Sequence, residues 1–228
     1  MHYALLLLIL ILLAFGPQFW ARYTFQRYAK PQKRIPGTGG ELAKHLLERF
    51  EIPDVQVEKT EPGQDHYDPS SKRVRLSPDN YDQNSLTAIA VAAHEVGHAI
   101  QHFRQEPTLL LRTRLAVYAR YAERIGGGAM VFLPIVVAIT HAPSAGLLML
   151  ILGFGSMAIG TLVHLVTLPM EYDASFGKAL PILKAGNYID AQDEIAIRRI
   201  LRAAAFTYVA SSLATLLNLW RWLRFFRR

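Results

Sequence analysis

The stretch His94-Glu95-Val96-Gly97-His98 places two imidazoles one helical turn apart, with a carboxylate between them. On an α-helix, residues four apart lie on one face with Cβ atoms about 6 Å from each other. His94 and His98 can therefore bind the same tetrahedral ion. Glu95 is placed to take a proton from a metal-bound water as a general base. The spacing is that of zinc hydrolases and predicts a zinc site.

The residues around this motif predict one helix from Ser85 to Phe103, with Asn84 or Ser85 as its N-cap. Apolar residues precede the histidines, and the segment contains no proline. A motif in its expected structural context is stronger evidence than five letters alone. The alternative interpretation is a solvated helix face that carries two unrelated histidines.

Apolar residues make up 51% of the 228-residue chain, and they are gathered into blocks. Blocks close to the roughly 20 residues needed to cross the hydrocarbon core predict membrane helices. The expected spans are 1–20, 126–142, 145–168 and 203–220, with a basic tail at 221–228. The first block lacks the basic start and cleavage site of a secretory signal, which favours a retained anchor. For the second and fourth blocks the alternative is a buried core helix, since Pro134 interrupts one and polar residues dilute the other.

Basic residues predict the orientation of these spans. Lysines and arginines cluster after the first block, before the second and after the third, at 22–34, 112–124 and 178–202. Because cytoplasmic loops are rich in Lys and Arg, segments 21–125 and 169–202 are expected in the cytoplasm. The result is a multi-pass protein of the cell (inner) membrane whose 141–144 turn lies outside. A fully crossing fourth span would place the basic tail outside, whereas a re-entrant helix would remove that conflict.

The net charge of +7 comes mostly from residues beside the apolar blocks. The lipid bilayer, with anionic lipid, is therefore the expected partner, and nucleic acid is not. The chain contains no cysteine, which excludes disulfides and thiolate ligands. Histidine and carboxylate side chains remain as the zinc ligands.

The polar region between the first two spans predicts a small α+β unit. A helix is expected at 41–50, and strands are expected at 55–57 and 72–76. In the second strand Val74 and Leu76 would face inward and the charged residues outward. On an edge strand, such charges either prevent aggregation or flank an edge that pairs with an extended substrate. The pattern does not distinguish these two interpretations.

A catalytic zinc ion needs a third protein ligand and one open position. His102 repeats the four-residue spacing, but about 12 Å of helix separates it from His94, too far for one ion. The other candidates are His66, His141, His164, Glu171 and Asp173. His141 is excluded because it falls on the outer side. Glu171 follows Pro169 and would begin a new helix, or a kinked continuation, at the inner boundary of the membrane, the depth expected for the His94 helix, which puts it ahead of the other candidates.

Five segments resemble, in order, the YugP-type membrane neutral zinc metallopeptidases: 65–69 (DHYDP), 74–77 (VRLS), 92–102 (AAHEVGHAIQH), 168–175 (LPMEYDAS) and 203–210 (AAAFTYVA). That family is similar in plan to HtpX-type membrane gluzincins, whose third ligand is a glutamate downstream of the HExxH helix. The resemblance covers most of the chain. It implies His94, His98 and Glu171 as the zinc ligands and Glu95 as the base. Gluzincins place an aspartate where this chain has Ser175, so Asp173 or Ser175 itself would have to support a zinc histidine.

The expected fold class is therefore mainly α: an integral membrane helical protein with a zincin-like α+β metalloprotease domain, built from a small β-sheet and the HExxH helix. The expected activity is Zn²⁺-dependent hydrolysis of peptide or protein substrates, membrane proteins among them. The alternative is a non-catalytic membrane scaffold whose structural zinc is closed by His66 or Asp173. An intramembrane protease is disfavoured, because polar residues closely flank the motif helix. Candidates for stabilising the oxyanion are His66, Tyr67, His164 and Tyr172.

Overall fold

The computed structural model describes residues 16–217, which fall into two compact units. The helical unit contains Leu111–Leu168 with residues from both ends of the chain, and the mixed unit contains Pro17–Leu110 and Pro169–Thr207. Most of the expected first span, the end of the fourth and the basic tail lie outside the described residues.

The mixed unit contains a three-stranded sheet of β1 (Gln56–Lys59), β2 (His66–Asp68) and β3 (Arg73–Leu76) in the order β1-β3-β2. β1 runs parallel to β3, and β2 runs antiparallel to it. The sequence predicts β1 and β3 but not the short β2. The expectation that residues 72–76 form an edge strand is wrong, because β3 is central. Its arginines pair with carboxylates on both neighbours, as Arg75 does with Glu58 at 2.6 Å and with Asp68 at 3.0 Å.

The motif helix α4 (Leu86–Phe103) lies at the centre of the mixed unit. It begins as expected after Ser85, whose hydroxyl accepts a hydrogen bond from the Ala88 amide at 3.1 Å. Every residue from Leu86 to Gln101 is buried. The alternative of a solvated helix with unrelated histidines is therefore wrong.

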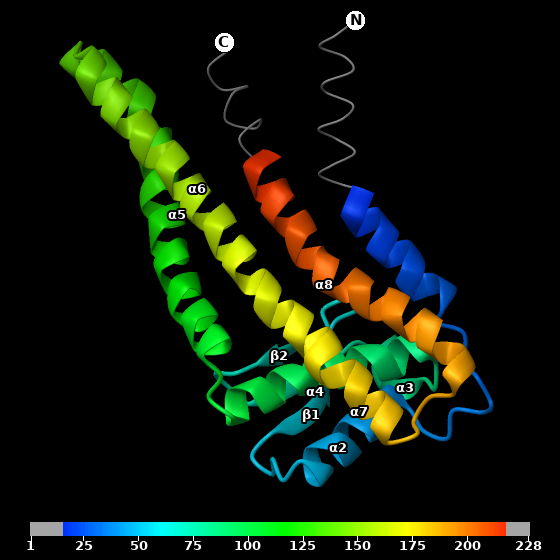
Figure 1. Cartoon of the computed structure of the whole chain (residues 1–228). Coiled ribbons are helices and arrows are strands. Elements are labelled where there is room, and N and C mark those ends of the chain that lie inside the picture. The colour runs from blue at the N-terminus through cyan, green and yellow to red at the C-terminus, as the bar shows by residue number, and fades with distance from the viewer. Residues whose placement is uncertain (1–15, 218–228) are drawn as a thin grey trace, which may run out of the picture. The chain divides into compact units, whose positions relative to one another are not determined.

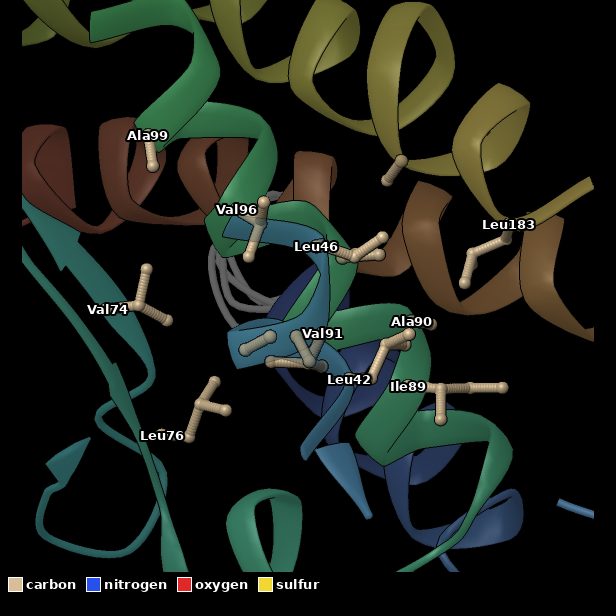
Figure 2. Close-up of a cluster of buried hydrophobic side chains, with 14 of the residues drawn as sticks. Leu42, Leu46, Val74, Leu76, Ile89, Ala90, Val91, Val96, Ala99 and Leu183 are labelled. Carbon is tan, nitrogen blue, oxygen red and sulfur yellow. The ribbon is translucent and has the colours of Figure 1, made fainter. Parts of the chain in front are cut away.

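The hydrophobic core lies between α4, the sheet and α2 (Gly39–Arg49). α2 begins with a capping box, in which the Thr38 hydroxyl accepts from the Glu41 amide and the Glu41 carboxylate accepts from the Thr38 amide. Figure 2 shows Leu46 of α2 and Val74 of β3 close to α4. α3 (Pro78–Asp82) connects the sheet to α4. The buried apolar residues thus hold α4 on two sides.

The second part of the mixed unit comes from the far end of the chain. The π-helix η1 (Asp173–Ala179) leads into α7 (Leu180–Ala185), the short 3₁₀ turn η2 (Ala191–Asp193) and α8 (Glu194–Leu217). Residues 16–27 are also helical. They lie along α8, where Trp20 makes an edge contact with Phe206 and Tyr28 accepts from Arg199 at 3.3 Å.

The helical unit is a hairpin of α5 (Pro107–Thr140) and α6 (Pro143–Tyr172), joined through His141 (Figure 1). α5 continues through Pro134, and α6 continues through Pro169. Within residues 16–217, α5 is the one helix long and apolar enough to cross a membrane by length and composition. Only 17% of its most apolar window is buried. The alternative of a buried core helix for the second block therefore does not describe α5.

Candidate metal centre

The two histidines of the motif lie on one face of α4, as their spacing predicts. Their ring centres are 4.7 Å apart, and both side chains are buried. The Nε2 atoms of His94 and His98 lie 3.4 and 3.1 Å from the same carboxylate oxygen, Oε2 of Glu171. Residues far apart in the sequence thus converge on one point.

Glu171 is fully buried, with an exposed fraction of 0%. Its second oxygen, Oε1, makes no hydrogen bond to any described residue. A buried carboxylate oxygen without a partner is costly, and a bound cation would satisfy it. One ligand atom from each of His94, His98 and Glu171 lies within 4.8 Å of the others. Two imidazoles and a carboxylate form a donor set that suits Zn²⁺.

The electrostatics of the metal-free site reflect this convergence. Burial alone would lower the pKa of His98. The negative charge and hydrogen bond of the Glu171 carboxylate have the larger effect, and the pKa of His98 is raised to about 9. Burial alone would raise the pKa of Glu171, but His98 and His94 hold it well below its usual range. Without a metal, a proton on His98 therefore takes the role of the cation.

Close packing of two helical segments brings Glu171 to the histidines. α6 does not break at Pro169, so Glu171 lies in its last turn, as the kinked-continuation alternative proposed. The π-helix η1 then packs against α4 at Gly97, where a Cβ atom would lie only 2.9 Å from the Ala174 carbonyl oxygen. π-Helical turns are rare and often occur at functional sites. A residue larger than glycine at position 97 would push this segment away.

The second nitrogen of each imidazole also has a partner. Ser175 Oγ lies 3.0 Å from His94 Nδ1 and donates to the Leu201 carbonyl at 3.3 Å. Because its one proton is used on that carbonyl, the hydroxyl accepts from Nδ1 of His94. Of Asp173 and Ser175, the two residues proposed from the sequence to support a histidine, Ser175 is the one that contacts His94. The second nitrogen of His98 lies 2.9 Å from the side-chain oxygen of Gln101.

Glu95 is buried beside the two imidazoles. Burial raises the pKa of its carboxyl group, and the charges of His94 and His98 offset this only in part. A carboxylate with a raised pKa accepts and returns protons more readily near neutral pH. The environment therefore suits a general base.

The model of the family described as "putative neutral zinc metallopeptidase" matches residues 3–227. The chain belongs to this metallopeptidase family. A curated relative from Bacillus subtilis (strain 168), named "Putative membrane protease YugP", is 35% identical over 228 residues. The match covers 97% of this chain and 97% of the relative. No solved structure matches the chain. The resemblance inferred from the sequence is confirmed, and zinc is the cofactor that the family and the side-chain cluster indicate.

Other histidines considered as zinc ligands in this metallopeptidase have different surroundings. His66 Nδ1 lies 2.7 Å from the Gln64 carbonyl, and its Nε2 faces Arg75 at 3.4 Å. His141 lies in the α5–α6 connection, within the helical unit. His164 belongs to α6 by its backbone, but its side chain falls outside the described structure. Neither His66 nor His141 is in the cluster of possible ligands found among the described residues.

His102 and Tyr67 contact each other at 2.7 Å through the tyrosine hydroxyl and Nδ1 of the imidazole. Burial raises the pKa of Tyr67 to about 12, so the hydroxyl stays protonated and donates to His102. Burial also lowers the pKa of His102. This pair is a structural contact between β2 and α4. It uses the hydroxyl of Tyr67, one of the residues proposed to stabilise the oxyanion.

Asp173 is not in the cluster of possible ligands, but it is linked to His98 through Gln101. It accepts from Gln101 at 2.8 Å and pairs with the buried Lys178. Neither Gln101 nor Lys178 is among the site residues predicted from the sequence. The available signal for Gln101 was its position three residues after His98, which places the two side chains side by side on a helix.

Proposed function

We propose that this protein is a membrane-bound zinc endopeptidase that hydrolyses peptide bonds in peptide or protein substrates. The observation that carries the proposal is the convergence of both histidine Nε2 atoms on Oε2 of the buried Glu171, whose other oxygen, Oε1, has no hydrogen-bond partner among the described residues. A buried anionic oxygen without a hydrogen bond is explained by a cation that it binds.

In this proposal His94, His98 and Glu171 hold the metal ion. When bound, zinc supplies a Lewis acid and lowers the pKa of a coordinated water. Glu95 takes the proton from the attacking water and transfers it to the leaving amine as the peptide bond breaks. Ser175 keeps the proton on Nδ1 of His94, so that Nε2 is directed toward the metal.

A non-catalytic scaffold with a structural zinc remains the second candidate. It would need a fourth protein ligand, because structural zinc sites are closed. The cluster found among residues 16–217 has three members. His66 and Asp173, the proposed fourth ligands, are engaged by Arg75 and Lys178. An open fourth position favours catalysis.

The proposed enzyme is a multi-pass protein of the cell membrane with its active site in the cytoplasm, and its partners are the lipid bilayer and a protein substrate. The exposed apolar surface of α5 supports membrane insertion, with Phe132 and Ile139 55% and 75% exposed. The basic segments beside the apolar blocks support the orientation.

Replacing the proposed base tests the activity. In Glu95→Gln, we expect the kcat for peptide cleavage to fall by about 10²–10⁴-fold, while zinc content and thermal stability stay close to wild type. Cleavage is measured with the full chain solubilised in detergent, and zinc by elemental analysis. Glu61→Gln, which removes an exposed carboxylate before β2, is the matched control. Undiminished turnover in Glu95→Gln, or wild-type cleavage after complete removal of the metal by a chelator, would refute the proposal.

A further inference from the structure

A buried amide contacts the metal centre without a role in the mechanism above. Gln101 has an exposed fraction of 0%, and its Oε1 lies 2.9 Å from Nδ1 of His98. A glutamine with no contact to solvent must satisfy its hydrogen bonds within the protein. Its partners therefore determine which way the amide points.

The amide nitrogen of Gln101 has two partners that can only accept. It lies 3.0 Å from the Met170 carbonyl oxygen and 2.8 Å from Oδ2 of Asp173. A flipped amide would place its oxygen against these two oxygens, so the flipped orientation is excluded. Oε1 must then face His98, and Nδ1 of His98 must carry a proton. The other ring nitrogen, Nε2, is left for the metal.

The two acceptors lie on either side of the third ligand. Met170 directly precedes Glu171, and Asp173 follows it by two residues. One amide thus binds the ring of His98 and also the backbone and side chain next to Glu171. This contact sets the position of the Glu171 segment relative to α4, which carries both histidines.

Asp173 is held in place by a buried ion pair. Lys178 is 8% exposed and pairs with Asp173 on one side and with Glu106 on the other, the latter at 3.0 Å. The same oxygen of Asp173 thus accepts from both the Lys178 ammonium group and the Gln101 amide. A continuous series of polar contacts therefore connects Glu106 to the proposed ligand His98, through Lys178, Asp173 and Gln101.

We propose that Gln101 is a positioning residue of the metal centre, which selects the tautomer of His98 and aligns Glu171 with both histidines. The inference rests on the proposed function only in taking zinc as the metal. His94 has a different arrangement, because a hydroxyl on the Glu171 side of the site supports it. Gln101 is the one contact among the described residues that joins His98 to both flanks of Glu171.

Zinc affinity tests the proposal without reference to activity. Gln101→Leu keeps similar volume and removes the amide, so we expect zinc to bind about 10–100-fold more weakly in competition with a chromophoric chelator. The visible spectrum of the Co²⁺-substituted protein is expected to change as well. Gln105→Leu is the matched control, because Gln105 is exposed and its amide donates only to the His102 carbonyl. Its affinity and spectrum should equal those of the wild type.

A charge exchange separates positioning from general loss of stability. Gln101→Glu places a carboxylate against Asp173 and should weaken zinc binding as much as the leucine variant. The double variant Gln101→Glu/Asp173→Asn restores a donor facing an acceptor at residue 173 but leaves the Met170 carbonyl facing a carboxylate oxygen, so we expect its affinity to recover in part and to exceed that of Gln101→Glu. If Gln101→Leu does not fold, the comparison between Gln101→Glu and the double variant decides the question.

Wild-type zinc affinity in the folded leucine variant, or a double variant no better than Gln101→Glu, would overturn the inference. These outcomes are distinct from failure of the proposed function. A protein without peptidase activity whose zinc affinity still depends on Gln101 would keep the positioning role and lose the enzymatic one. Loss of cleavage in Glu95→Gln combined with no effect of Gln101→Leu would give the reverse result.

Discussion

At the scale of single residues, a proton and a metal ion compete for the same nitrogen of His98. Glu171 raises the pKa of this histidine to about 9 despite burial, because its carboxylate faces Nε2 at 3.1 Å. In the metal-free protein His98 is thus an imidazolium paired with Glu171 at neutral pH. Zinc must displace that proton in order to bind.

This competition predicts the pH dependence of zinc binding. Between pH 6.5 and 9 the affinity should rise about tenfold per pH unit and then level off, because one proton is released. Chelator-competition titrations across this range measure the slope. An affinity that does not change between pH 6.5 and 9 would contradict the assignment of the raised pKa to His98.

The stability of the metal-free protein should show the same ionisation. The folded pKa of His98 lies above its unfolded value of about 6.5. Its stabilising contribution is therefore fully present below pH 6.5 and is lost as the pH rises through about 9. Thermal unfolding in detergent follows this loss. In His98→Gln, the part of the pH dependence due to this residue should be absent.

Single residues differ in how far the sequence could predict them. His94, Glu95 and His98 lie within one helical turn, so local spacing alone identifies them. Glu171 lies 73 residues after His98; its position after Pro169 put it ahead of the other candidates, and the family resemblance then selected it. Gln101 was missed because an amide is not a zinc ligand, and its role depends on Met170 and Asp173, which folding brings to it.

At the scale of elements, the site depends on how closely η1 approaches α4 at Gly97. In Gly97→Ala, helix propensity would stabilise α4 by about 1 kcal/mol. The added Cβ would lie 2.9 Å from the Ala174 carbonyl, and overpacking of this kind costs about 1–3 kcal/mol. The net effect is a loss of about 0–2 kcal/mol in stability. Ala174 lies three residues after Glu171, so the displacement should weaken zinc binding by at least about tenfold.

Chelator competition and thermal unfolding of the same preparation separate the two effects. Gly127→Ala is the control, since a Cβ at that position of α5 would meet no atom within 4 Å. It should gain helix propensity and keep its zinc affinity. Wild-type zinc affinity in Gly97→Ala would mean that the close approach does not position Glu171.

Helices were easier to predict than their irregularities. The start of α4 follows from Ser85 as expected, whereas α2 begins at Gly39, two residues before the expected 41, because the Thr38 side chain satisfies a free amide of its first turn. β2 has three residues, too few for an alternating pattern, so β3 was taken for an edge. The π-helix η1 has no sequence signal of its own, because its hydrogen bonds shift with tertiary packing. The π-helix η1, which packs the Glu171 segment against α4, was thus the element least predictable from the sequence.

At the scale of the whole molecule, the chain combines a mixed unit that contains the candidate site with a helical unit that exposes apolar side chains. Each is built from segments that alternate along the sequence. The mixed unit takes its second half from residues 169–207, which follow the α5–α6 hairpin. For the proposed topology, both halves of the mixed unit must lie on one side of the membrane, which requires the hairpin to cross it twice.

The absence of cysteine allows this topology to be tested directly, because a single introduced thiol reports its own location. Gln64→Cys is exposed in the mixed unit, and Ser144→Cys is exposed at the start of α6. A membrane-impermeant maleimide should label Ser144→Cys in intact spheroplasts, and Gln64→Cys only after permeabilisation. Arg224→Cys in the basic tail should be labelled from outside if the last span crosses, and protected if it is re-entrant. Labelling of Gln64→Cys in sealed cells would place the mixed unit outside and reverse the orientation inferred from the basic residues.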